Sequence, residues 1–426
     1  MTGLDAGVEL TALGNGLRVV THQMPHLHSA TLGVWAGSGS RHESESLQGI
    51  SHLLEHMAFK STRNRTTRQM AEEIEAVGGE INAATSQEST AYFARVLAAD
   101  TGLAIELLAD MLQNPRFDAD ELARERGVIL QEIAAASDQP EDIVFERAES
   151  VAFAGQSLGR AILGTPQSVR RITPADLHRH MQQNYQPKNL VISAAGAIRH
   201  VDVVRHAEAL FGSSNGGESP PAEPARFSGG KIVLNEAFEQ HHVLIAFEGP
   251  SYFDPRYCGA QILTGILGGG ASSRLFQKVR EDHGLCYAID AFGWSYMDSG
   301  IVGVHAATSS DLVEQLMTMV AAEIVDLAEQ GPSTAELERA KAQIKAGLLM
   351  GLESSATRAE QMARQVLILG KPMTSQQLGD SIDDVSGSKI REIAGDIFCT
   401  SPHIWSEVGP GANGRFAKET AAALLR

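Results

Sequence analysis

The chain has 426 residues, of which 43% are hydrophobic and 20% are charged, and this balance is typical of a folded globular protein. A chain of this length is long enough for two or three domains. Thirty-five basic residues against 52 acidic ones give a net charge of −17, which argues against nucleic-acid binding because such proteins present a basic surface.

The number of cysteines and the hydropathy of the sequence indicate the cellular compartment in which the protein is expected to reside. Only three cysteines occur, and they lie far apart, at Cys258, Cys286 and Cys399. This excludes a disulfide framework and a cysteine-rich zinc site, and it fits a reducing compartment. No apolar stretch approaches the roughly 18 residues of a membrane span, and the first residues lack the pattern of a secretory signal. We therefore expect a cytoplasmic protein that has no membrane segment.

Taken in chain order, the first half alternates pairs of strands with pairs of helices. β-branched and aromatic residues between turn-formers predict strands at residues 16–22, 30–37, 80–86 and 90–97. Apolar residues at helical spacing predict helices at residues 49–59, 67–77, 99–113 and 118–136. Adjacent pairs of each kind indicate an α+β fold with a mainly antiparallel sheet packed against helices.

Residues 213–230 read as a linker, because they are rich in Gly, Ser and Pro and show no apolar periodicity. The segments on either side look alike. The strand at Thr31 resembles the one at His242, 211 positions later, and the helix around Glu121 resembles the one around Glu336, 215 positions later. Two matches at nearly equal offsets predict two tandem homologous domains, 1–212 and 231–426.

The residues that carry chemistry begin with His52, Glu55 and His56 in the predicted helix 49–59. Two histidines four residues apart lie on the same side of a helix, so both imidazoles can reach one ion. A carboxylate on that side can accept a proton from a metal-activated water. Such a pattern also occurs by chance, but three polar side chains on an otherwise apolar helix would each cost about 1–3 kcal/mol if buried without partners. A metal removes that cost.

A catalytic zinc needs a third protein ligand, and the predicted helix 118–136 offers Glu121, Glu125 and Glu132. The last two are seven residues apart and share a face, whereas the first recurs in the second half and is expected to be solvated. Glu125 and Glu132 align with Ala340 and Gly347, and the second half contains no His-x-x-Glu-His. The sequence therefore predicts one Zn²⁺ per chain, although manganese and cobalt fit the same ligands.

These motifs carry a resemblance to a known family. His-x-x-Glu-His followed by a glutamate 76 residues later resembles the pitrilysin (inverzincin) family of zinc metallopeptidases. The phrase Leu-Glu-His-Met-Ala-Phe-Lys at residues 54–60 is similar to the bacterial homologues of the mitochondrial processing peptidase β subunit. The resemblance implies the fold of that peptidase, with His52, His56 and Glu132 as zinc ligands, Glu55 as general base and Glu125 as a supporting acid.

The resemblance also implies residues that bind substrate. In the family, an Arg and a Tyr seven residues apart in the second domain contact the substrate, and Arg280 and Tyr287 match them. Without the resemblance these two would be read as a surface arginine and a core tyrosine. The family adds the substrate as an edge strand, and the matching positions are Asn82, Ala83 and Ala84.

The expected function is zinc-dependent hydrolysis of unfolded peptides, with basic peptides a candidate class, inside a chamber. The resemblance implies a homodimer whose active sites are completed in trans. One alternative is a non-catalytic or partner-dependent subunit of a processing peptidase-like heterodimer. A second alternative is a metal hydrolase that acts on a small molecule, because the inverted motif also occurs in a short lyase of related fold.

Overall fold

The computed structural model describes residues 5–214, 216–399 and 402–424. The chain forms two compact units that are interleaved in sequence. Unit 1 holds the described residues through Ala134, together with Arg160–Glu223 and Leu348–Gln377. Unit 2 holds Ala135–Gly159, Pro224–Gly347 and the described residues from Leu378 onward.

Unit 1 contains a six-stranded sheet in which only one pair of neighbours, β2 and β6, is parallel. Its strands, in order across the sheet, are β1 (Val8–Ala12), β2 (Arg18–Gln23), β6 (Leu190–Gly196), β3 (Ser29–Ala36), β5 (Thr90–Leu97) and β4 (Glu80–Thr85). The four strands predicted in the first half are confirmed as β2 to β5, with ends within two residues. The edge strands β1 and β4 are the more exposed ones.

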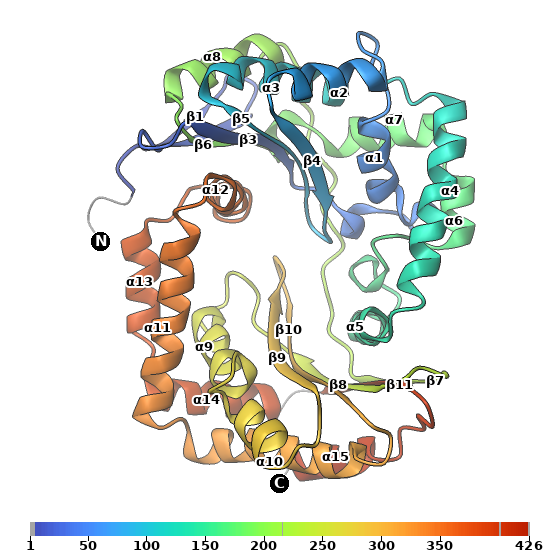
Figure 1. The fold of residues 1–426 in the computed structure, drawn as a ribbon, viewed down its shortest axis with the longest axis vertical. Coiled ribbons are helices and arrows are strands. Elements are labelled where there is room, and N and C mark those ends of the chain that lie inside the picture. The colour runs from blue at the N-terminus through green and yellow to red at the C-terminus, as the bar shows by residue number, and fades with distance from the viewer. Residues whose placement is uncertain (1–4, 215, 400–401, 425–426) are drawn as a thin grey trace. The chain divides into compact units, whose positions relative to one another are not determined.

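Helices cover both faces of this sheet (Figure 1). The helices in and around unit 1 are α1 (Ile50–Ala58), α2 (Thr67–Ala76), α3 (Thr101–Gln113), α4 (Ala119–Ala136), α6 (Pro166–Arg171), α7 (Pro174–Asn184), α8 (His200–Phe211) and α12 (Ser355–Leu369). Short 3₁₀ turns lie at Ser40–His42, Glu45–Leu47, Ala98–Asp100 and Pro187–Asn189. The four predicted helices are confirmed as α1 to α4. Capping boxes on Thr66, Thr165 and Thr173 begin α2, α6 and α7.

Unit 2 contains a five-stranded sheet with one parallel pair, β7 and β11. Its strands, in order, are β7 (Gly230–Asn235), β11 (His403–Gly409), β8 (His241–Glu248), β10 (Gly300–Thr308) and β9 (Ala288–Ser295). Its α-helices are α5 (Pro140–Ala152), α9 (Tyr257–Gly268), α10 (Val313–Gln330), α11 (Thr334–Gly351), α13 (Ser375–Asp383), α14 (Gly387–Phe398) and α15 (Ala417–Leu424). It also contains a 3₁₀ turn at Ser157–Gly159 and the π-helix η6 (Phe276–Asp282). A few residues of α11 and of α13 belong to unit 1.

The duplication inferred from the sequence is visible in the topology. The strand order β2-β6-β3-β5-β4 of unit 1 recurs as β7-β11-β8-β10-β9 in unit 2, and the parallel pair occupies the same place. Helices α4 and α11 both have 18 residues, and their first residues are 215 positions apart. The predicted class, two tandem α+β domains with mainly antiparallel sheets, is confirmed.

The two halves exchange one helix. α5 follows α4 as α12 follows α11, yet α5 packs on the sheet of unit 2 and α12 on the sheet of unit 1 (Figure 1). Met362 and Val366 of α12 are fully buried in a cluster with Val20 and Trp35. The predicted domains 1–212 and 231–426 correspond to the two copies of the sequence repeat. They do not predict that α5 packs in unit 2 and α12 in unit 1. Between α8 and β7 the described residues form no helix or strand, and most of them are exposed or half-buried.

In the described ranges, no helix is both long and apolar enough to cross a membrane.

Candidate metal centre

The apolar and the polar side chains of α1 lie on opposite sides of the helix, because each kind recurs at intervals of three or four residues. One side is buried in the core of unit 1 and carries Ile50, Leu53, Leu54 and Met57. The other side carries His52, Glu55 and His56, as the spacing predicts. Burial of the apolar side holds the helix in place, so the polar side chains are presented from a fixed backbone.

His52, His56 and Glu132 come together between α1 and α4. Their three ligating atoms lie within 4.8 Å of one another, and this is the one such group of three found among the described residues. The Oε2 atom of Glu132 is 3.8 Å from Nε2 of His52 and 3.6 Å from Nε2 of His56. Ligand atoms of a tetrahedral zinc lie about 3.4 Å apart, given bonds of about 2.0–2.2 Å. The observed spacing therefore fits one zinc ion.

The hydrogen bonding of Glu132 and the protonation of His52 are also compatible with a bound metal ion. Oε2 of Glu132 is buried and accepts no hydrogen bond within the described part of the chain, which leaves its charge uncompensated by any donor. Burial, and secondly the neighbouring His56, lower the pKa of His52 to about 4. His52 is consequently a neutral imidazole at neutral pH, and that is the form that binds zinc.

Glu125 contacts the ring nitrogen of His56 that does not face Glu132. Its Oε2 is 3.1 Å from Nδ1 of His56, and its Oε1 is 2.6 Å from Nζ of Lys60. A carboxylate on Nδ1 orients the imidazole and directs Nε2 toward the metal. Lys60 was not predicted; it lies in the turn that follows the end of α1 at Ala58. Glu121 instead pairs with Arg124 at the surface, 2.7 Å away, as expected of a solvated residue.

Glu55 lies next to the ligands and is held by a residue that the sequence did not indicate. Its Oε2 accepts a hydrogen bond of 2.5 Å from the hydroxyl of Thr85. Burial raises the pKa of Glu55, while the hydrogen bond from Thr85 acts in the opposite direction. Thr85 is the last residue of β4, and nothing in its sequence neighbourhood points to α1. The contact arises from packing of α1 against β4.

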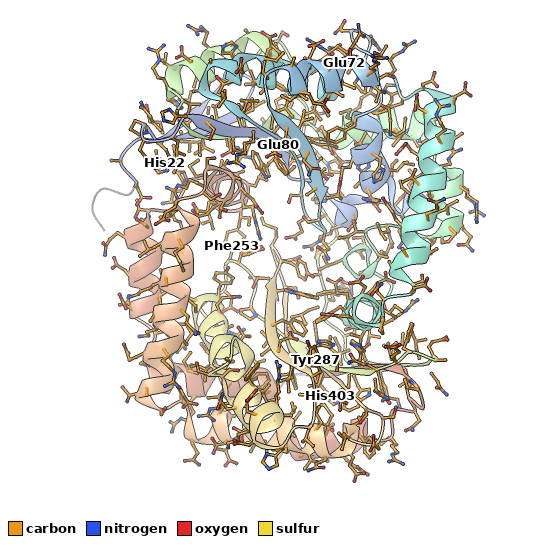
Figure 2. All side chains as sticks on the ribbon, in the orientation of Figure 1. His22, Glu72, Glu80, Phe253, Tyr287 and His403 are labelled. Carbon is orange, nitrogen blue, oxygen red and sulfur yellow. The ribbon has the colours of Figure 1, made fainter. Side chains whose placement is uncertain are left out.

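The predicted substrate-binding positions Asn82, Ala83 and Ala84 lie on β4, at the edge of the sheet. Among the described strands β4 pairs with β5 alone, and Figure 2 labels Glu80 at the beginning of β4. Asn82 and Ala84 are exposed, whereas Ala83 is half-buried. A free edge with small side chains can accept an extended peptide.

Arg280 and Tyr287 form a second group, in unit 2. Arg280 belongs to the π-helix η6, and Tyr287, labelled in Figure 2, directly precedes β9 with 75% of its surface exposed. The guanidinium carbon of Arg280 is 5.4 Å from the ring centre of Tyr287 and 4.6 Å from that of Phe276. The structure thus brings the two predicted residues together and adds an aromatic ring that packs on the arginine.

Solved structures of known proteins share this fold. The crystal structure of a protease from Helicobacter pylori superposes with a TM-score of 0.88 at 22% identity, covering 95% of this chain and 99% of that one. A chain of complex III2 from Candida albicans superposes with a TM-score of 0.86 at 23% identity, covering 98% of this chain and 100% of that one.

Sequence relatives are more similar. A protein of Rickettsia bellii named "Uncharacterized zinc protease" is 38% identical over 92% of this chain and 95% of its own length. An Arabidopsis thaliana protein named "Probable mitochondrial-processing peptidase subunit beta, mitochondrial" is 35% identical over 94% of this chain and 78% of its own length. Residues 18–166 match the model of "Insulinase (Peptidase family M16)", and residues 171–344 match that of "Peptidase M16 inactive domain". The chain belongs to peptidase family M16.

Proposed function

We propose that this chain is a zinc-dependent endopeptidase that hydrolyses unfolded peptides. The observation that carries the proposal is the convergence of His52, His56 and Glu132 within 4.8 Å, with Glu55 on the same side of α1. Relatives named zinc protease support a peptidase, and two histidines with one glutamate form a recognised catalytic ligand set.

The chemistry follows from the placement of these side chains. A bound zinc ion supplies a Lewis acid that polarises a substrate carbonyl and acidifies a water molecule. Glu55 accepts a proton from the attacking water and later delivers it to the leaving amine nitrogen. Because burial raises its pKa, Glu55 is better matched to both proton transfers near neutral pH than an ordinary carboxylate. Glu125 holds the ring of His56 throughout.

The edge strand β4 supports an extended peptide as the substrate. A peptide that pairs with Asn82, Ala83 and Ala84 must be unfolded, since its own backbone groups are used in the pairing. Arg280 and Tyr287 carry donors suited to substrate carbonyl oxygens and to the developing oxyanion. The widely spaced cysteines favour a reducing compartment, the cytoplasm.

The test is cleavage of an unfolded, moderately basic peptide by the zinc-loaded protein beside Glu55→Gln at equal zinc content. Cleavage by the unmodified protein and none by the variant is the expected result. Equal cleavage by the unmodified protein and by Glu55→Gln would show that Glu55 is not the general base. Cleavage that survives complete removal of zinc by a chelator would refute the metal centre.

A homodimer with sites completed in trans makes a separate prediction. Co-expression of a Glu55→Gln chain with an Arg280→Ala chain yields mixed dimers in which one site carries neither change. Activity recovered in the isolated mixed dimer is expected. A mixed dimer no more active than either single variant would contradict sharing in trans.

The second candidate function is that of a partner-dependent subunit, which the name of the Arabidopsis thaliana relative favours because it denotes one subunit of a peptidase. This function predicts that the purified chain binds zinc and cleaves no peptide alone. Activity that appears only on addition of a second, different chain would establish it in place of the homodimer.

A further inference from the structure

The zinc-binding helix α1 begins at a residue that cannot cap it. Its N-cap, Gly49, adopts a left-handed φ of 88° and has no side chain to accept a hydrogen bond. A Cβ at this position would lie 2.7 Å from the carbonyl oxygen of Leu163 and 2.9 Å from Cα of Gly164. The close approach of the 163–164 backbone therefore requires glycine. The first N–H groups of α1 need acceptors from elsewhere.

Glu43 supplies those acceptors. One carboxylate oxygen accepts the N–H of Gly49 at 2.7 Å, and the other accepts the N–H of Ser51 at 2.8 Å. Glu43 is buried, with 5% of its surface exposed. Its own carbonyl oxygen accepts a hydrogen bond of 3.0 Å from Arg160, which fixes the backbone that carries it. A negative charge at the N-terminus of a helix also interacts favourably with the helix dipole.

A hydrogen bond also connects the first turn of α1 to helix α7. The hydroxyl of Ser51 lies 3.3 Å from Nε2 of His180 on α7, and the side-chain amide of Asn184 donates to the carbonyl oxygen of His180 at 3.0 Å. These three side chains are buried, as is that of Glu43. His52 directly follows Ser51 in the chain. The backbone from which the first metal ligand projects is thus held by a buried polar network that touches no metal ligand side chain.

The hydrogen bonds at position 43 call for two acceptor oxygens, and the amide analogue, glutamine, has one. Both oxygens accept an N–H, whereas the side chain of glutamine offers one acceptor and one donor. The donor would face a backbone N–H that is then left unpaired. The energetic cost of the arrangement is visible in the carboxylate itself, because burial raises the pKa of Glu43 to about 7 even though the N–H groups of Ser51 and Gly49 act to lower it. The positional role is indicated by the geometry, because the two carboxylate oxygens accept the N–H groups of Gly49 and Ser51 in the first turn of α1.

We propose that Glu43 is a positioning residue for the metal centre. By fixing the first turn of α1 it sets the direction from which His52 approaches the ion, so zinc affinity depends on a side chain that does not touch zinc. This inference rests on the proposed metal centre and not on the identity of the substrate. Groups that hydrogen-bond metal ligands directly contribute about 10- to 100-fold to metal affinity, and the effect of Glu43, which acts through the backbone, is expected at the lower end of this range.

The test is the zinc affinity of the full-length Glu43→Gln protein, measured by competition with a chelator at a temperature at which circular dichroism shows the protein folded. Affinity weaker by about 10-fold is expected, the lower end of the range for groups that orient metal ligands. The absorption spectrum of the cobalt-substituted protein is expected to change as well, because the ligand geometry changes. Neither quantity depends on the cleavage assay.

Glu336→Gln is the matched control. Glu336 is also a partly buried carboxylate at a helix N-terminus, where it accepts the N–H of Ser333 at 2.7 Å and binds Arg274, but it lies in unit 2 on α11. Its loss is expected to reduce stability and to leave zinc affinity unchanged. Equal affinity in Glu43→Gln and the unmodified protein, or equal losses in both variants, would overturn the proposal.

If Glu43→Gln does not fold, Glu43→Asp carries the test. The shorter side chain keeps the charge but cannot reach both N–H groups in the same geometry, so weaker zinc binding is expected. Unmodified affinity in folded Glu43→Asp would overturn the proposal. Absence of zinc binding by the unmodified protein would refute the metal centre itself, which distinguishes that failure from a failure of the role of Glu43.

Discussion

The hydrogen bond between Thr85 and Glu55 allows a direct test of how Glu55, the proposed general base, is held in place. Thr85→Val removes the hydroxyl donor while it preserves the branched shape of the side chain. The Thr85 hydroxyl donates to Oε2 of Glu55 at 2.5 Å, and both residues are half-buried. In the variant the carboxylate loses this side-chain donor, whereas the backbone N–H of Thr85, which also interacts with Glu55, remains.

The magnitude follows from the charge on the acceptor. A hydrogen bond to an ionised group contributes about 1.5–3 kcal/mol, and each 1.36 kcal/mol changes a rate about tenfold. Loss of the donor also makes Glu55 more basic, which acts in the opposite direction. Placement has the larger effect, because a misplacement of about 1 Å can cost about 100-fold in rate. We therefore expect kcat to fall by about 10- to 150-fold while KM changes little.

The assay is steady-state peptide cleavage at equal zinc content, with Thr85→Ser as the control. Serine keeps the hydroxyl and loses only a methyl group, so its kcat is expected to stay close to that of the unmodified protein. An unmodified kcat in Thr85→Val would refute the reasoning. A KM that rises in both variants while kcat stays constant would instead assign Thr85 to the binding of substrate along β4.

Three further predictions concern the metal centre and the scaffold. Glu125→Gln is expected to weaken zinc binding by about 10- to 100-fold, measured by chelator competition, because His56 loses the carboxylate on Nδ1; unchanged affinity would contradict this role. Burial acts to raise the pKa of Glu336, but hydrogen bonds from Arg274 and Ser333 lower it to about 2. The ionised form therefore stabilises the fold above pH 4.5, and this contribution is lost as the pH falls toward 2. Glu336→Gln is expected to lower the free energy of unfolding by about 1–2 kcal/mol at pH 7, a value discounted for solvent screening. Urea titrations should show the difference narrowing below pH 4.5, and a difference independent of pH would refute the assignment. Gly49→Ala is expected to lower the unfolding free energy by about 1–3 kcal/mol in thermal melts, because its φ of 88° and its contact with Leu163 leave no room for a Cβ; an unchanged melting temperature would contradict the close approach.

The parts of this protein that the sequence predicts are those governed by local periodicity. His52 and His56 are four residues apart and Glu125 and Glu132 are seven apart, so helix geometry alone places each pair on one face. The first-half strands and helices were predicted for the same reason. Several of their ends differ by one or two residues, because hydrophobic spacing does not decide where a helix begins; α1, for example, begins after its N-cap Gly49.

The parts that the sequence did not predict depend on contacts between distant segments. Thr85 meets Glu55 only because β4 packs beside α1, and Glu43 meets Ser51 only because the chain between them folds back. The exchange of α5 and α12 is of the same kind. Both helices bury apolar residues, such as Val144 of α5 and Val366 of α12, and a helical pattern of apolar residues does not specify which sheet it covers.

The second half of the chain has neither carboxylate at the positions that correspond to Glu125 and Glu132. Ala340 occupies the place of Glu125 at the same position along α11, and it is buried to a similar degree, with 3% of its surface exposed against 6%. A glutamate at 340 without an imidazole partner would be a buried, unpaired charge, which costs several kcal/mol. At Gly347, the counterpart of Glu132, an added Cβ would meet nothing within 4 Å. Space therefore permits a side chain there, and what the second half lacks is the histidine pair that would make either carboxylate favourable.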